Sequence, residues 1–178
     1  MKMLILALGL LNTLVMAEDY VSNPSKGHLV FEAVGKPAMI KIKGESPAPK
    51  SSMMHSKGSV RIESALELDQ LKTGIDLRDE HMKEKYLEIK KYSQAKLIIE
   101  NLAIPENTEI KDQEFSGTLN LHGKEAPVKG VFNMSKDRLV EAEFKIKLTD
   151  YGIEIPEYMG INVAETVNIK TKIQFEKK

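Results

Sequence analysis

The feature that most constrains the fold of this chain is an alternation of apolar and polar residues with a period of two. Side chains of a β-strand point alternately to its two faces, so this pattern predicts strands with one buried face and one face in water. About eight such runs follow one another at short spacing, which indicates an all-β chain folded as an antiparallel sandwich or barrel. The inward face is expected to include Phe31, Ile40, Ile62, Phe115, Leu119, Phe132, Phe144, Ile146 and Ile169.

Turn residues separate these runs in the places where hairpins are needed. His122-Gly123 stands between two runs, and residues 135–138 form a second polar turn. Residues 46–49 contain two prolines and end another run, because proline cannot donate a hydrogen bond to a neighbouring strand. Gly117 and Gly130 fall on inward positions, where the missing side chain either leaves room inside or marks a tight bend.

Residues 66–89 break the alternation. Their apolar residues are spaced by three and four rather than by two, which predicts a short helix over residues 76–82. Asp76 or Asp79 is expected near the start of this helix, because aspartate favours the first turn. A single helical insertion in a β-barrel often covers one end of the barrel, and we expect that placement here.

The first seventeen residues are organised as a secretory signal. Lys2 precedes an apolar run, and Ala17 follows it as a small residue at a cleavage site. The run is shorter than the ~18 residues needed to span a bilayer, so we expect cleavage, with an uncleaved interfacial anchor as the alternative. The chain has no cysteine, so a lipoprotein anchor and disulfides are not expected. We therefore expect one domain, residues 18–178, in the periplasm or secreted.

The charge balance and the motif content disfavour several classes of function. Lysine and arginine number 26, as do aspartate and glutamate, and tryptophan is absent. Such a chain has no long-range attraction for nucleic acid and few rings on which bases could stack. No GxSxG, HExxH, Walker or dinucleotide-binding motif is present, so we expect a protein that is not an enzyme. The four histidines are scattered, without the close spacing of metal ligands.

Two clusters could carry chemistry, and each has a plainer interpretation. Met53-Met54-His55 could form a soft Cu(I) site, but thioethers more often line a cavity or fill gaps in a core. Arg78, with Asp79 and His81, could bind a polar ligand head at a barrel mouth. The alternative for this second cluster is a helix cap with solvated ion pairs, and the sequence favours neither.

Three blocks of sequence together resemble one family. They are LKTGIDLRDEHM (residues 71–82) running into YLE (86–88), GTLNLHGKEAPV (117–128), and LTDYGI (148–153) followed by VAETV (163–167). In order and spacing they are similar to the YceI family of bacterial exported proteins, and the resemblance covers nearly all of the chain after residue 17. The least typical parts are the N-terminal block and residues 46–58.

The resemblance implies a lipocalin-like barrel with a long apolar tunnel that holds a polyisoprenoid, such as a prenyl pyrophosphate or quinone, or another long amphiphile. It implies a carrier or store in the periplasm, with no cofactor apart from a bound lipid. The expected lining is the inward set given above together with Met54, and Arg78 and His81 are expected at the polar mouth. Because burial of each CH₂ contributes ~0.8 kcal/mol, we expect cavity length to select the ligand more than its head group does.

Two other functions remain open at this stage. The barrel could be closed and filled, acting as an exported structural or interaction module without a ligand, or it could be an enzyme that acts on a lipid in the tunnel. Transient contact with a membrane is compatible with a lipid carrier. A homodimer formed through edge strands or residues 46–58 is also compatible with the pattern.

Overall fold

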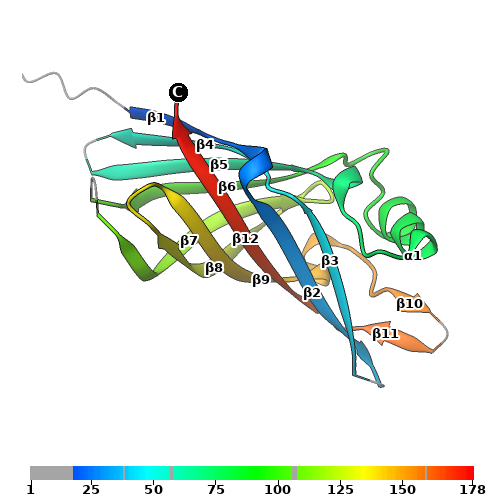
Figure 1. Cartoon of the computed structure of the whole chain (residues 1–178). Coiled ribbons are helices and arrows are strands. Elements are labelled where there is room, and N and C mark those ends of the chain that lie inside the picture. The colour runs from blue at the N-terminus through cyan, green and yellow to red at the C-terminus, as the bar shows by residue number, and fades with distance from the viewer. Residues whose placement is uncertain (1–17, 38, 57, 106–107, 159) are drawn as a thin grey trace, which may run out of the picture.

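The computed structural model describes residues 18–37, 39–56, 58–105, 108–158 and 160–178. The predicted signal segment, residues 1–17, lies outside these residues. The described chain forms one antiparallel sheet with short helical segments between some of its strands (Figure 1). The strands are β1 (Glu18–Ser22), β2 (His28–Lys36), β3 (Ile40–Pro47), β4 (Lys50–Ser56), β5 (Ser59–Glu67), β6 (Gln94–Ala103), β7 (Ile110–Leu121), β8 (Lys124–Met134), β9 (Leu139–Lys147), β10 (Glu157–Tyr158), β11 (Ile161–Val163) and β12 (Thr166–Lys177). The helical segments are η1 (Pro24–Lys26), η2 (Leu68–Gln70), α1 (Asp76–Glu80), η3 (His81–Tyr86) and η4 (Leu148–Tyr151).

In the described part of the chain, the sheet closes on itself as a barrel with eight strand positions. The strands β4, β5, β6, β7, β8, β9 and β12 follow one another around the barrel, and β12 pairs with β1, which pairs with β4. Two of the eight positions are each occupied by two strands. One holds β1 and then β2, which pair with successive parts of β12, and the other holds β4, which pairs with β1, and β3, which pairs with β2. The predicted antiparallel barrel of about eight strands is confirmed.

The predicted turns connect neighbouring strands of this barrel. His122 and Gly123 join β7 to β8 with φ angles of 54° and 72°. A two-residue hairpin turn with two positive φ angles matches the twist of the strands, and glycine adopts such a φ without strain. The turn from β8 to β9 is held by the Ser135 amide, which donates to the Leu139 carbonyl at 3.0 Å.

The ring of hydrogen bonds is complete at one end of the barrel and split at the other. At the complete end, β1 pairs with both β12 and β4. Toward the other end, β3 pairs with β2 along its length, while its second edge meets the rest of the described chain in one bridge between Glu45 and Lys72. Two backbone hydrogen bonds of 2.8 and 2.9 Å form that bridge. On this side Ile40, Ile75 and Leu77 line the barrel interior and are also exposed to solvent, so the interior is open there, and we call this opening the mouth.

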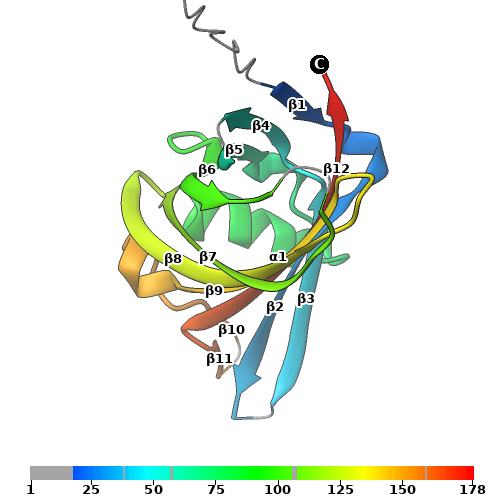
Figure 2. The same ribbon diagram turned by 90° about the vertical axis from the view of Figure 1, so that its left-hand side faces the viewer.

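A short helical segment lies at the mouth (Figures 1 and 2). The helix predicted over residues 76–82 is confirmed as α1, which continues into η3. Ile75 is the N-cap residue and offers no side-chain cap. Asp79 instead accepts hydrogen bonds from the Thr73 amide at 2.7 Å and the Thr73 hydroxyl at 2.5 Å, which fixes the loop before the helix. Among the described residues, no helix is long and apolar enough to cross a membrane.

Candidate ligand-binding cavity

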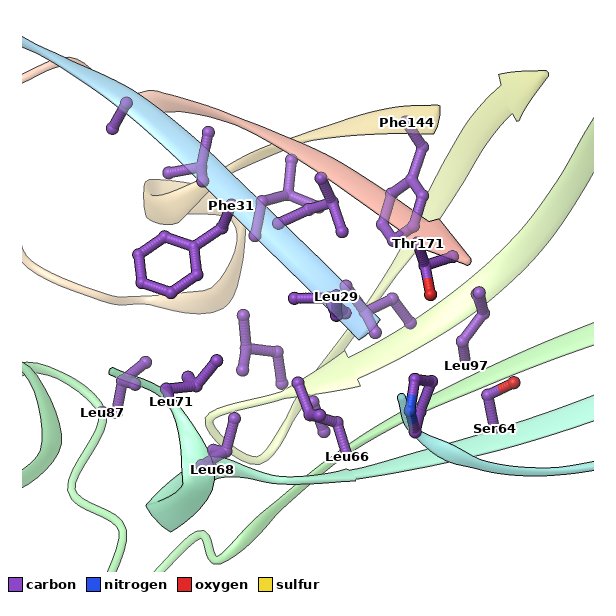
Figure 3. Close-up of a pocket in the computed structure, with 18 of the residues that line it drawn as sticks. Leu29, Phe31, Ser64, Leu66, Leu68, Leu71, Leu87, Leu97, Phe144 and Thr171 are labelled. Atoms are coloured by element: carbon purple, nitrogen blue, oxygen red, sulfur yellow. The ribbon is translucent and has the colours of Figure 1, made fainter. Parts of the chain in front are cut away.

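The barrel encloses an apolar cavity of about 520 Å³. All eight strand positions and the helical segment contribute side chains to its wall. In Figure 3, Leu29 and Phe31 of β2 face Leu66, Leu68 and Leu71 across this space. The volume lies within the range of about 300–1,000 Å³ typical of small-molecule sites. The interior is therefore hollow rather than filled by its own side chains.

Nine of the ten apolar residues predicted to line the interior do line this cavity. Their side chains come from seven strands, and most of them are buried, because the period-two pattern places them on the inner face. Ile40 is an exception in exposure: 46 % of its surface is open to solvent, and it lies at the edge of the mouth. The nine residues are Phe31, Ile40, Ile62, Phe115, Leu119, Phe132, Phe144, Ile146 and Ile169.

The prediction that Met54 lines the interior is wrong. Its side chain is 44 % exposed, whereas Met53 is fully buried and contacts the cavity. Successive residues of β4 alternate between the two faces, so Ser51, Met53 and His55 point inward while Met54 points outward. Because two methionines are adjacent, the sequence does not show which of them points inward. The positions of Ser51 and His55 could have decided this only if the partner strands were known.

The same register separates the members of the proposed copper motif. Met53 and Met54 point to opposite faces of β4, so their thioethers cannot converge with His55 on one ion. The His55 ring is 2 % exposed, and its Nε2 lies 3.0 Å from the Ile104 carbonyl oxygen. This contact ties the segment after β6 to β4 at the complete end of the barrel.

Gly117 and Gly130 do not enlarge the cavity, as one interpretation of the sequence suggested. A Cβ on Gly130 would lie 2.3 Å from the Glu143 carbonyl oxygen, and one on Gly117 would lie 2.7 Å from the Ile98 carbonyl oxygen. Their role is to let neighbouring strands approach closely. Gly44 does make room inside, because a Cβ there would collide with the Phe31 ring at 2.1 Å.

The lining also contains residues that the strand pattern did not single out. Leu66 lies near the end of β5, Leu68 and Leu71 lie on the path from β5 toward α1, and Leu87 follows η3. The apolar spacing in residues 66–89 was the available signal, since these residues form the inner side of the helical insertion. Ile161 of β11 also lines the cavity, and it had no periodic signal because β11 has only three residues.

Polar side chains in the lining fall into two groups. Inside, the Ser64 hydroxyl lies 2.8 Å from the Ser51 hydroxyl, and the Thr171 hydroxyl donates to the His28 carbonyl at 3.4 Å. Protein groups therefore satisfy both interior hydroxyls. The remaining hydrogen-bonding or charged groups come from the helical insertion, the loop before it, and β10: Thr73, Arg78, His81, Tyr86 and Glu157. A ligand would therefore meet an apolar interior with one polar end.

Arg78 and His81 both line the cavity at this polar end, as predicted. Arg78 donates from Nε to the Thr73 hydroxyl and from Nη2 to the Thr73 carbonyl, both at 2.8 Å. Within the described chain, no carboxylate lies within ion-pair distance of Arg78, whose hydrogen-bond partners are neutral oxygens of Thr73. Arg78 thus braces the loop before the helix without the ion pair that the plainer interpretation expected, and its role in binding a ligand head stays a prediction.

The three sequence blocks that resemble one family meet at a junction beside the mouth. His122, in the β7–β8 turn, places Nε2 2.7 Å from the Glu88 carboxylate and Nδ1 3.2 Å from the Tyr151 carbonyl oxygen. The Tyr92 ring packs against the His122 ring with centroids 4.6 Å apart. Burial, aided by the charge of Asp150, raises the pKa of Tyr151 to about 12. We call these contacts of His122 with Glu88, Tyr92 and Tyr151 the junction.

The junction brings residues that are distant in the sequence into direct contact. It fastens the end of the helical insertion to the β7–β8 turn and to η4. Its contacts restrict the helical insertion at the mouth without contributing to the cavity lining. Sequence reasoning found the blocks but not this contact, because their mutual distances depend on the closed barrel.

Comparisons with known proteins agree with this architecture. A polyisoprenoid binding domain from Saccharophagus degradans, implicated in plant cell wall breakdown, superposes with a TM-score of 0.69 at 19 % identity, covering 89 % of this chain and 98 % of that one. BcnA from Burkholderia cenocepacia gives 0.63 at 16 % identity, covering 85 % and 98 %. A YceI protein from Campylobacter jejuni gives 0.50 at 15 % identity, covering 77 % and 85 %.

At these identities, the solved structures show a shared fold. No curated protein matches the chain. The model of the YceI-like domain matches residues 20–175, which is nearly the entire described chain. The barrel, the helical insertion at its mouth and this match lead to one conclusion: the chain belongs to the family of YceI-like domain proteins.

Proposed function

We propose that this protein binds a polyisoprenoid, such as a prenyl pyrophosphate or quinone, or a similar long amphiphile, inside the barrel. The observation that carries the proposal is the apolar cavity of about 520 Å³ that opens at a polar mouth. Burial of each CH₂ group contributes ~0.8 kcal/mol before the costs of binding, so a long chain needs no specific polar partner along its length. The polyisoprenoid-binding neighbour from Saccharophagus degradans supports the same ligand class.

The arrangement of polar groups suggests how the ligand is oriented. The chain would lie among residues such as Leu29, Leu97 and Phe144, with its head at the mouth beside Arg78. Thr73 holds the Arg78 guanidinium in place, so little side-chain freedom is lost when an anionic or carbonyl head binds there. We expect this contact to tune affinity, while the apolar wall supplies most of it.

Binding without catalysis fits the site better than turnover. The interior hydroxyls of Ser64 and Thr171 bond to protein oxygens, and no base lies beside them in the described lining to activate either one. The proposal includes transport or storage in the periplasm, which follows from the predicted signal segment and the family. The alternative of a filled barrel acting only through its surface does not account for the cavity.

Organic extraction and mass spectrometry of the purified protein test the proposal directly. A bound isoprenoid or other long amphiphile is expected in protein from the native host, and added prenyl lipid is expected to raise Tm, since a ligand that binds only the folded state stabilises it. A protein that carries no lipid and whose Tm does not respond would contradict the proposal.

A cavity-filling substitution locates the binding to the interior. Ala142 lines the cavity, whereas Ala103 is exposed on β6. Ala142→Trp is expected to abolish binding of a fluorescent prenyl probe. Ala103→Trp is the matched control, and it should still bind the probe. The chain has no tryptophan, so each new indole also reports whether its site is buried. Equal probe binding by both variants would place the ligand elsewhere.

A further inference from the structure

Of the four most exposed large apolar side chains in the described part of the chain, three lie at the mouth and the fourth, Met39, precedes one of them in sequence. Met39 is 66 % exposed, Ile75 53 %, Leu77 51 % and Ile40 46 %. Ile40, Ile75 and Leu77 also line the cavity, so the exposed surface is continuous with its apolar wall. Such a patch costs free energy in water unless something covers it during function.

The hairpin of β2 and β3 carries part of this patch away from the barrel. Figures 1 and 2 both show the ends of β2 and β3 projecting beyond the barrel. Pairing of Gly35 with Ile40 and of Val34 with Lys41 extends to this end of the hairpin. We call the described residues 36, 37 and 39–41 the hairpin tip.

The outer part of this hairpin, residues 33–44, carries charge of one sign, whereas Glu32 and Glu45 lie farther from the tip. Residues 33–44 contain Lys36, Lys41 and Lys43 and no acidic residue, and all three lysines are exposed. No carboxylate of the described chain lies within ion-pair distance of any of them. Lysines on the barrel wall differ, since Lys172 pairs with Glu141 at 2.9 Å and Lys170 with Glu143 at 3.8 Å. The hairpin is thus a cationic site in a chain of zero formal net charge.

We infer that the mouth docks on the surface of an anionic lipid bilayer, with Met39 and Ile40 entering the headgroup region. Apolar side chains flanked by lysines suit this interface, because the lysine stems reach along apolar surface while their ammonium groups meet lipid phosphates. On the helical side of the mouth, the acidic Asp76 and Glu80 are offset by the basic Lys83 and Lys85, so the net positive charge lies on the hairpin side.

Docking in this orientation would give a lipid chain a dry path. The lipid chain could pass from the bilayer across Ile40 and Leu77 into the cavity, since these residues belong to both the exposed patch and the lining. This path rests on the proposed lipid-binding function. The docking itself does not, and it can be measured with vesicles that contain no isoprenoid.

Vesicle flotation tests the docking surface, using protein as the expressing cell processes it and with its N-terminus determined by mass spectrometry. We expect binding to phosphatidylcholine vesicles that contain phosphatidylglycerol, weaker binding in high salt, and little binding to phosphatidylcholine alone. Met39→Asp combined with Ile40→Asp should abolish binding. The matched control is Met54→Asp combined with Val131→Asp, which places the same charges at exposed apolar positions away from the mouth.

The lysines are tested separately. Replacing Lys36, Lys41 and Lys43 with glutamine should weaken binding to anionic vesicles about 100-fold, from about fivefold for each lysine near the membrane. The matched control replaces Lys145, Lys170 and Lys172 with glutamine, which removes the same charge from the barrel wall. An equal loss in the control would show general electrostatic attraction and overturn the assignment to the hairpin.

The remaining outcomes also decide the inference. If the wild-type protein does not bind anionic vesicles but still binds a fluorescent prenyl probe in solution, the docking inference is wrong and the proposed function stands. If it binds vesicles but no probe, the proposed function fails instead. Sedimentation without vesicles covers the other occupant of the patch: a dimer that Met39→Asp dissociates would identify the tip as a contact between two copies, and the membrane inference would fail.

Discussion

The two ends of the barrel are built from the same strands but differ in almost every physical respect. At the complete end, β1 pairs with both neighbours, Met53 is fully buried, and His55 bonds to the Ile104 carbonyl. At the mouth, β3 meets the chain beyond β5 in a single bridge, and apolar side chains face solvent. The comparison teaches that alternation builds a barrel wall, while the completeness of strand pairing decides which end opens.

The polar groups at the two ends differ in the same way. Buried polar atoms at the complete end bond to other protein groups, as unpaired ones would cost free energy. At the mouth, Arg78 is braced by Thr73 but has no carboxylate partner in the described chain. The complete end should therefore contribute stability, and the mouth should contribute binding and local motion.

The largest expected effect is at the complete end. Met53→Ala should lower the free energy of unfolding by about 3 kcal/mol, because it removes a fully buried side chain and leaves a cavity. Met54→Ala is the matched control on the outer face of β4 and should cost less than about 0.5 kcal/mol. Urea denaturation measures both. Equal losses would contradict the register and remove the contrast between the ends.

A smaller and more local effect is expected at the junction. His122→Ala removes hydrogen-bonding contacts with Glu88 and Tyr151 and should lower the free energy of unfolding by about 2 kcal/mol. Hydrogen exchange should accelerate mainly in residues 76–88, which the junction fastens, and stay slow in β4. Asn120→Ala, in the same hairpin, is the control. Uniform acceleration across the barrel would show that the mouth is not an independent unit.

The smallest effect concerns the ligand head. Arg78→Gln should weaken binding of a prenyl pyrophosphate about tenfold, since one charge-assisted contact is lost at a partly exposed site. Binding of the corresponding prenyl alcohol should be unchanged, because the apolar wall is intact. Lys85→Gln, which removes a nearby exposed cation outside the lining, is the control. A similar loss for the alcohol would indicate that Arg78 supports the mouth structurally instead.

Much of the candidate site could be predicted because its wall follows a local rule. Phe115 and Leu119 of β7 line the cavity because they are four positions apart, and Phe144 and Ile146 of β9 do so because they are two apart. The prediction for Met54 failed because Met53 and Met54 are identical neighbours, which leaves the phase of the alternation undefined. The interior Gly130 was open to two interpretations, since only the distance to the Glu143 carbonyl shows whether space or backbone lies beside it.

The sequence by itself determined most of the barrel strands and their inward faces, the position of the helical insertion and the family, but it did not single out β1, β4, β10 or β11. Each of these features depends on residues that are close together in the chain or on the amino acids of short sequence blocks. Only the tertiary structure decided the closure of the barrel through β1 and β12, the split beside β3, the cavity volume and the junction of His122 with Glu88 and Tyr151. The physical reason is that those features depend on pairing between residues as distant as Tyr20 and Lys177, and a local pattern carries no information about such distances.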